Sequence, residues 1–191
     1  MARSLPYLES MTTAFPRLET ERLILRALTL ADAPRLQQLA GEREIAANTM
    51  NIPHPYPDGA AEEWITSVAE TFAAGTGANF AVTLRESGEL IGGCGLVIKE
   101  IHQRAELGYW IGKPYWGHGY ATEAARAVIG YAFSRGLNRV FAEHYATNPA
   151  SGRVLQKLGM RHEGTLRQHM VKWEQPMDME VYSILRSEWK S

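Results

Sequence analysis

Alternating apolar and polar positions predict strands along much of the chain. The first is the run Arg22-Leu23-Ile24-Leu25-Arg26, in which every second side chain can face a core. Ser87-Gly88 separates two further runs of this kind and therefore predicts a hairpin. The predicted strands are residues 22–26, 80–84, 90–98, 105–111, 140–145, about 165–173 and about 177–185.

Apolar residues at spacings of three and four predict about four helices. The first is expected from the Thr29–Asp32 capping pair to Ala40, and the second from a cap at Asp58 to near Gly75. The third is expected from Gly117-His118-Gly119 to Gly136, and the fourth from a cap at Asn148 to Gly159. Three alternating prolines exclude regular structure in residues 51–57. The order of elements predicts one mixed α/β sheet with helices, in a single domain of residues 17–191 behind an extension of residues 1–16.

Composition narrows the class of protein. The 191 residues are 45% hydrophobic and 21% charged, with a net charge of −1, which is ordinary for a single globular domain. Without a basic excess we expect no nucleic acid and no membrane as partner. The apolar run Leu90–Ile98 is far shorter than the ~20 residues of a membrane span, and residues 1–16 lack a secretory h-region. The single cysteine, Cys94, favours a reducing, cytoplasmic location.

The turn around Gly117-His118-Gly119 is the clearest candidate for binding. Small residues at 117, 119 and 121 let backbone N–H groups at a helix start point toward an anion. The alternative is a tight turn with no ligand. A nucleotide P-loop is excluded because no Lys-Ser/Thr pair follows Gly119. A dinucleotide-binding turn stays open, with Glu143 as its acidic residue, although Thr122 stands in place of the third glycine.

A set of motifs in one order resembles the GNAT N-acetyltransferases, in particular the subgroup that acetylates ribosomal-protein N-termini. Trp116-x-x-Gly119-x-Ala121 is similar to the acyl-CoA loop of that family. The other matching segments are Thr20-Glu21-Arg22-Leu23, Gly108-Tyr109-Trp110, Asn148-x-x-Ser151 and Lys157-Leu158-Gly159-Met160. The resemblance covers about residues 18–186 and implies a mostly antiparallel sheet of about seven strands flanked by about four helices.

The resemblance also implies acetyl-CoA as the cofactor and assigns residues to it. Pantetheine would pair with the strand residues Tyr109, Trp110 and Ile111. The pyrophosphate would meet the loop of Trp116, Gly117, His118, Gly119, Tyr120, Ala121 and Thr122. Asn148 and Ser151 would lie near the thioester and the pantetheine amide, although Asn148 also fits a plain helix cap. Lys157 is either a phosphate contact or a solvated last-turn lysine.

Transfer of an acetyl group to an amine needs a neutral amine and a leaving thiolate that is stabilised or protonated. Glu106 is the candidate base, and an ordinary edge carboxylate is the competing interpretation. Ser151 or Tyr145 would serve the thiolate, and a backbone N–H near Trp110 or Ile111 would hold the oxyanion. His144 is an alternative base, although a lone histidine on a strand is more often structural.

Neither covalent catalysis nor a metal is expected. Cys94 lies between two glycines in an apolar strand with no neighbouring base, which predicts an inert buried thiol and direct transfer. The six histidines show no paired ligand spacing, so we expect no metal site.

The acceptor is the least determined part of the reaction. We expect residues 48–60 and the last hairpin to bind it, with Tyr56, Trp64 and Trp173 as possible walls or as core residues. The resemblance favours a protein N-terminal amine, with a polyamine, amino sugar or amino acid as alternatives. A noncatalytic acyl-CoA-binding module and a dehydrogenase also stay open, and the oligomeric state is not predicted.

Overall fold

The computed structural model describes residues 14–190. Most of the predicted extension, residues 1–13, therefore lies outside the described residues. Phe15, near its end, already packs into the core: its ring centroid lies 4.5 Å from that of Phe72 and 4.9 Å from that of Phe80.

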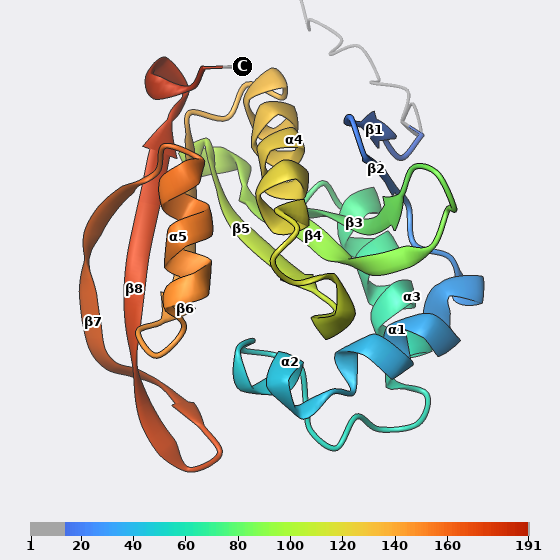
Figure 1. The fold of residues 1–191 in the computed structure, drawn as a ribbon. Coiled ribbons are helices and arrows are strands. Elements are labelled where there is room, and N and C mark those ends of the chain that lie inside the picture. The colour runs from blue at the N-terminus through green and yellow to red at the C-terminus, as the bar shows by residue number, and fades with distance from the viewer. Residues whose placement is uncertain (1–13, 191) are drawn as a thin grey trace, which may run out of the picture.

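Eight strands form one sheet in the order β1-β2-β3-β4-β5-β6-β8-β7 (Figure 1). They are β1 (Leu18–Glu19), β2 (Leu23–Arg26), β3 (Gly77–Leu84), β4 (Leu90–Lys99), β5 (Arg104–Ile111), β6 (Arg139–Tyr145), β7 (Arg161–Lys172) and β8 (Gln175–Leu185). Every neighbouring pair is antiparallel except β5 and β6. The predicted mixed, mostly antiparallel sheet is confirmed, with the two-residue β1 as an additional strand. Such a sheet excludes the parallel dinucleotide-binding fold.

The α-helices are α1 (Ala33–Ala40), α2 (Arg43–Ala47), α3 (Ala60–Ala73), α4 (Tyr120–Ser134) and α5 (Pro149–Lys157). The sequence did not predict α2, because five residues are too few to display a helical period. The predicted cap at Asp58 is wrong. Gly59 occupies the cap position with φ of 81°, and Asp58 instead accepts a hydrogen bond from Gln37. No helix within residues 14–190 is long and apolar enough to cross a bilayer.

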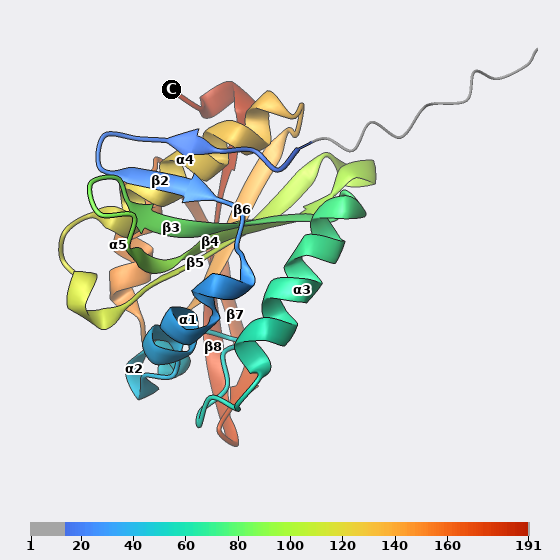
Figure 2. The ribbon, with the colours of Figure 1, turned by 90° about the vertical axis from the view of Figure 1, so that its right-hand side faces the viewer.

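Helices cover both faces of the sheet (Figure 2). Buried residues of α4, among them Val128 and Ile129, pack on one face against Phe80, Leu96 and Leu107. On the other face, α1 and α3 form a smaller apolar cluster with Ala81, Leu90 and the partly buried Trp110. Alternate residues of β5 therefore point toward two different groups of helices, with Tyr109 on the α4 side and Trp110 on the α1 and α3 side.

The sheet splits between its two parallel strands. β5 and β6 pair only from Arg104 to Glu106 and from Arg139 to Phe141. Beyond that point β5 continues to pair with β4 as far as Ile111, and β6 with β8 as far as Tyr145. The ends of β5 and β6 thus diverge, leaving backbone edges that are not joined to each other, in the middle of the sheet.

Candidate active site

A cleft of about 780 Å³ lies at this split. Its walls come from the ends of β5 and β6, from α3, and from the irregular segment that follows α2. The residues predicted for catalysis, Glu106, Tyr145 and Ser151, all line it, as do Tyr109 and Trp110. Ile111 does not, since it is buried toward α4.

Glu106 is half-buried where the two strands begin to separate. Burial raises the pKa of its carboxyl group, and the nearby carboxylate of Glu143 on β6 raises it further, against a smaller opposing effect of Arg104. A carboxyl group with a raised pKa is a better proton acceptor at neutral pH than an ordinary glutamate.

Ser151 is joined to the sheet by Tyr109. Their hydroxyl oxygens are 2.8 Å apart, and the Tyr109 hydroxyl also donates to the Ser151 carbonyl oxygen at 3.2 Å. Burial raises the pKa of Tyr109, so its phenol stays protonated. The side chain of Asn148 accepts a hydrogen bond from the Ser151 N–H, which caps α5 and holds Ser151 in its first turn.

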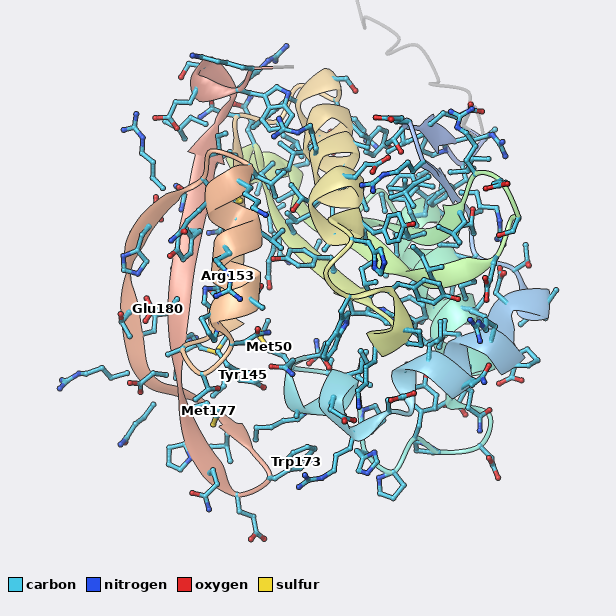
Figure 3. The ribbon with its side chains drawn as sticks, viewed as in Figure 1. Met50, Tyr145, Arg153, Trp173, Met177 and Glu180 are labelled. Carbon is cyan, nitrogen blue, oxygen red and sulfur yellow. The ribbon has the colours of Figure 1, made fainter. Side chains whose placement is uncertain are left out.

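Two adjacent residues at the end of β6 carry buried polar atoms without partners among residues 14–190. They are the hydroxyl of Tyr145 and Nε2 of His144. Nδ1 of His144 lies 2.8 Å from the Tyr145 carbonyl oxygen and must donate to it, so Nε2 is a bare acceptor in the neutral ring. The ring also stacks on Tyr182, 5.7 Å between centroids. Tyr145 and Met50, both labelled in Figure 3, line the cleft.

The glycine loop lies outside the cleft lining, at the N-terminus of α4. Gly117 and Gly119 have φ of 81° and 83°, a conformation that favours glycine. The Trp116 indole donates to the Ile111 carbonyl oxygen at 2.5 Å and ties the loop to the end of β5. Within residues 14–190, the backbone N–H groups of residues 117–122 donate to no backbone oxygen. They are available to an anion at the positive end of the helix dipole.

The sequence did not reveal which residues hold this loop in place. Arg22 on the turn before β2 donates to the His118 carbonyl oxygen at 3.0 Å and lies over the Tyr120 ring at 4.8 Å. It also pairs with Glu123, Nη2 to Oε2 at 2.6 Å, and Thr20 donates to the same carboxylate. Burial alone would raise the pKa of Glu123, but the hydrogen bonds from Thr20 and Arg22 outweigh it and lower the pKa.

Comparisons with known proteins identify the family. A protein-family model described as "Acetyltransferase (GNAT) domain" matches residues 22–161. The chain belongs to the GNAT acetyltransferase family. A Bacillus subtilis relative, the uncharacterized N-acetyltransferase YoaA, is 37% identical over 183 residues, covering 90% of this chain and 98% of the relative.

Two further GNAT relatives have names that state an acceptor. The Escherichia coli [ribosomal protein uS5]-alanine N-acetyltransferase is 26% identical, covering 91% of this chain and 92% of the relative. A solved structure of a putative ribosomal-protein-serine acetyltransferase from Vibrio cholerae is 26% identical with a TM-score of 0.74, covering 91% of this chain and 99% of the other. The resemblance inferred from the sequence motifs is confirmed, and the chain is an N-acetyltransferase.

GNAT acetyltransferases use acetyl-CoA, and this chain has the features that fit it. The amides of residues 117–122 suit a diphosphate, and a Cβ at Gly117 would meet no atom within 4 Å among the described residues. The free edge of β5 beyond Glu106 suits the amides of a pantetheine arm. Nothing comparable fits a metal: no cluster of three or more His, Cys, Asp or Glu side chains occurs in residues 14–190.

The remaining predicted residues take other places. Cys94 is buried, and burial raises the pKa of its thiol, so it is a poor nucleophile. Tyr56 and Trp64 line the cleft, whereas Trp173 sits at the tip of the β7–β8 hairpin with Arg43 5.1 Å above its ring (Figure 3). Lys157 lies in the last turn of α5 as an exposed side chain.

Several residues of the site were missed. Arg22 and Glu123 meet at the loop through contacts between elements that are distant in sequence, and Glu143 was considered only as the acidic residue of a dinucleotide site. Arg22 is part of a recognisable motif, but nothing in that motif states that it reaches a loop 96 residues later. Glu143 could have been found from the alternation of β6, which places it on the same face as Phe141, the register partner of Glu106.

Proposed function

We propose that this GNAT protein transfers an acetyl group directly from acetyl-CoA to the α-amine of a protein N-terminus. The observation that carries the proposal is the split between β5 and β6. It brings a carboxyl group with a raised pKa and two hydroxyl groups to one cleft, beside a strand edge that can hold a thioester arm. Two relatives named for acetylating ribosomal proteins support the choice of acceptor.

Acetyl-CoA supplies the acetyl group as an activated thioester. In the proposed reaction the loop amides bind the diphosphate, and Thr122 adds a hydroxyl donor at the same helix end. Glu106 accepts a proton from the acceptor ammonium, directly or through water, so that the amine nitrogen has a free lone pair. The hydroxyl of Ser151 or Tyr145 donates a proton or hydrogen bond to the departing sulfur. A backbone N–H near Trp110 or Ile111 holds the oxyanion.

Small amines are the second candidate acceptors. The two carboxylates Glu106 and Glu143 in one cleft would attract any ammonium group, including that of a polyamine. We place the reaction in the cytoplasm, since the lone buried thiol of Cys94 suits a reducing compartment.

A panel of acceptors tests the proposal. The purified protein is mixed with acetyl-CoA and with N-terminal peptides, spermidine, glucosamine or free amino acids, and both thiol release and acetylated product are measured. We expect product on the α-amine of peptides at the highest kcat/KM. A preference for spermidine would mean that the acceptor is a polyamine and not a protein N-terminus. Binding of acetyl-CoA without turnover on any amine would identify a noncatalytic module.

A further inference from the structure

The floor of the cleft contains positions without side chains. Asn79 on β3, Gly95 on β4 and Gly108 on β5 are register partners across three neighbouring strands. All three line the cleft. Because register partners point to the same face of a sheet, this row presents one carboxamide followed by two glycines. We name these three residues the glycine trough.

The two glycines of the trough differ in what packing requires of them. A Cβ at Gly95 would lie 2.2 Å from Oδ1 of Asn79, so the carboxamide lies directly over this glycine. A Cβ at Gly108 would meet no atom within 4 Å among the described residues, and its φ lies outside the left-handed region. Packing therefore explains why residue 95 is a glycine, but it does not explain why residue 108 is one, with open space above it.

Two side chains that can donate hydrogen bonds line the cleft at the trough. The carboxamide nitrogen of Asn79 is one, and the Trp110 indole nitrogen, 2.9 Å from where a Cβ on Gly93 would lie, is the other. Neither pairs with a backbone or side-chain acceptor within the described part of the chain. Two carboxylates line the same cleft: Glu106, two residues before Gly108 and so on the same face of β5, and Glu143 on β6.

Donors and acceptors together indicate the chemistry of the occupant. An ammonium group offers only donors and is matched by the two carboxylates. A carbonyl group next to that ammonium would be matched by Asn79 or Trp110. A polyamine has no carbonyl and would leave both donors without partners, which weakens binding.

We propose that the glycine trough is the acceptor subsite, and that it takes an α-amine whose neighbouring carbon carries an amide carbonyl. Asn79 donates to that carbonyl, and the missing side chain of Gly108 makes room for the acceptor backbone. This inference rests on the proposed transfer to a protein N-terminus, and it names the residues that would recognise the carbonyl group and the backbone of that acceptor.

Two small probes of similar size that share the CH3–CH(NH2) group test the role of Asn79. Alaninamide carries the carbonyl, and sec-butylamine replaces its carboxamide with an ethyl group. For Asn79→Ala we expect kcat/KM on alaninamide to fall about five- to tenfold, the loss of one hydrogen bond, with kcat/KM on sec-butylamine unchanged. Affinity for acetyl-CoA should also be unchanged. An equal fall on both probes, or no fall, would overturn the role of Asn79.

Substitution of Gly108 tests the trough itself. Gly108→Val puts a side chain into open space and suits a strand, so the protein should fold and bind acetyl-CoA as before. We expect kcat/KM on both probes to fall at least tenfold. Gly130→Ala on α4, which also meets no atom within 4 Å, is the matched control. Unchanged acetylation by Gly108→Val would refute the trough, whereas a wild-type protein that binds acetyl-CoA and acetylates neither probe would refute the proposed function.

Discussion

Ser151 and Tyr109 share a hydrogen bond whose purpose can be tested by removing one oxygen at a time. Ser151→Ala removes one of the two hydroxyls proposed to serve the leaving thiolate and should slow turnover at least tenfold, within the range typical of lost proton transfer. Affinity for acetyl-CoA should stay within about twofold, because the diphosphate loop is untouched.

The control for this prediction is Tyr109→Phe, which keeps Ser151 and removes only its partner. If Ser151 is the proton donor, Tyr109→Phe should cost less than Ser151→Ala. Turnover of Ser151→Ala at the wild-type rate would leave the Tyr145 hydroxyl as the donor, since it is a buried cleft hydroxyl that has no partner in residues 14–190.

Glu106 and Glu143 are expected to set the acid limb of the pH profile. A base must be deprotonated to act, and the pKa of Glu106 is raised, so kcat/KM should fall at a pH above the ordinary glutamate range. In Glu143→Gln the neighbouring negative charge is absent, the Glu106 pKa falls, and the acid limb should move to lower pH. A limb that does not move would show that Glu143 does not act on the group that titrates; Glu106→Gln should lose the limb together with most activity.

At the scale of elements, α4 combines an anion site with an acidic residue in its first turn. Glu123 would repel a diphosphate at this helix end if Arg22 did not neutralise it. Arg22→Ala should therefore weaken acetyl-CoA binding about tenfold. Acetylpantetheine, which has the thioester arm without the diphosphate, should keep its KM.

The double variant Arg22→Ala with Glu123→Gln distinguishes charge from folding. If Arg22 acts by neutralising Glu123, the second change should restore part of the lost affinity, measured by titration calorimetry. Equal losses for acetyl-CoA and acetylpantetheine would mean that Arg22 only supports the fold.

The elements themselves were largely predictable where hydrophobic periodicity extends over several turns or a full strand, as in α4 and β4. The helix start at Asp58 was misplaced because a glycine with positive φ does the work of a cap there, and one sequence does not reveal a backbone angle. The turn before α4 was predicted from Gly117 and Gly119, whose positive φ angles confirm it. Its anchorage by Arg22 was not, because ion pairs between distant elements leave no periodic signal.

At the scale of the whole molecule, the last hairpin closes onto the segment after α2. The Lys172 ammonium donates to the carbonyl oxygens of Thr49, Met50 and Ile52, at 2.9, 3.4 and 3.1 Å. Burial lowers the pKa of this lysine, which indicates a partly desolvated charge held by those carbonyl dipoles.

Lys172→Met should loosen this wall without touching the cofactor loop. We expect faster hydrogen exchange in residues 48–53 and a KM for the acceptor raised several-fold, with acetyl-CoA affinity unchanged. Arg167→Met, on the exposed part of β7, is the matched control. Unaltered exchange in residues 48–53 would mean that the three hydrogen bonds do not order the segment.

The identity of the acceptor could not be derived from the sequence, because the shape of the cleft is a property of the whole molecule. The cleft draws its walls from β3, β5, β6, α3 and the segment after α2, so its shape depends on how the whole sheet twists and splits. The sequence indicated residues 48–60 and several aromatic residues for acceptor binding. The most informative position, Gly108, has no side chain, and nothing distinguishes it in the sequence before its register partners are known.

The divergence of β5 from β6 also has a kinetic consequence. Tyr109 and Ser151 are reached from the α4 side of the sheet, while Gly108 and Trp110 face the α1 and α3 side. Acetyl-CoA and the amine can therefore approach the cleft from opposite faces of the sheet and be bound at the same time. Initial velocities measured over a grid of both concentrations should give intersecting double-reciprocal lines, the signature of a ternary complex, and parallel lines would point to an acetylated enzyme instead.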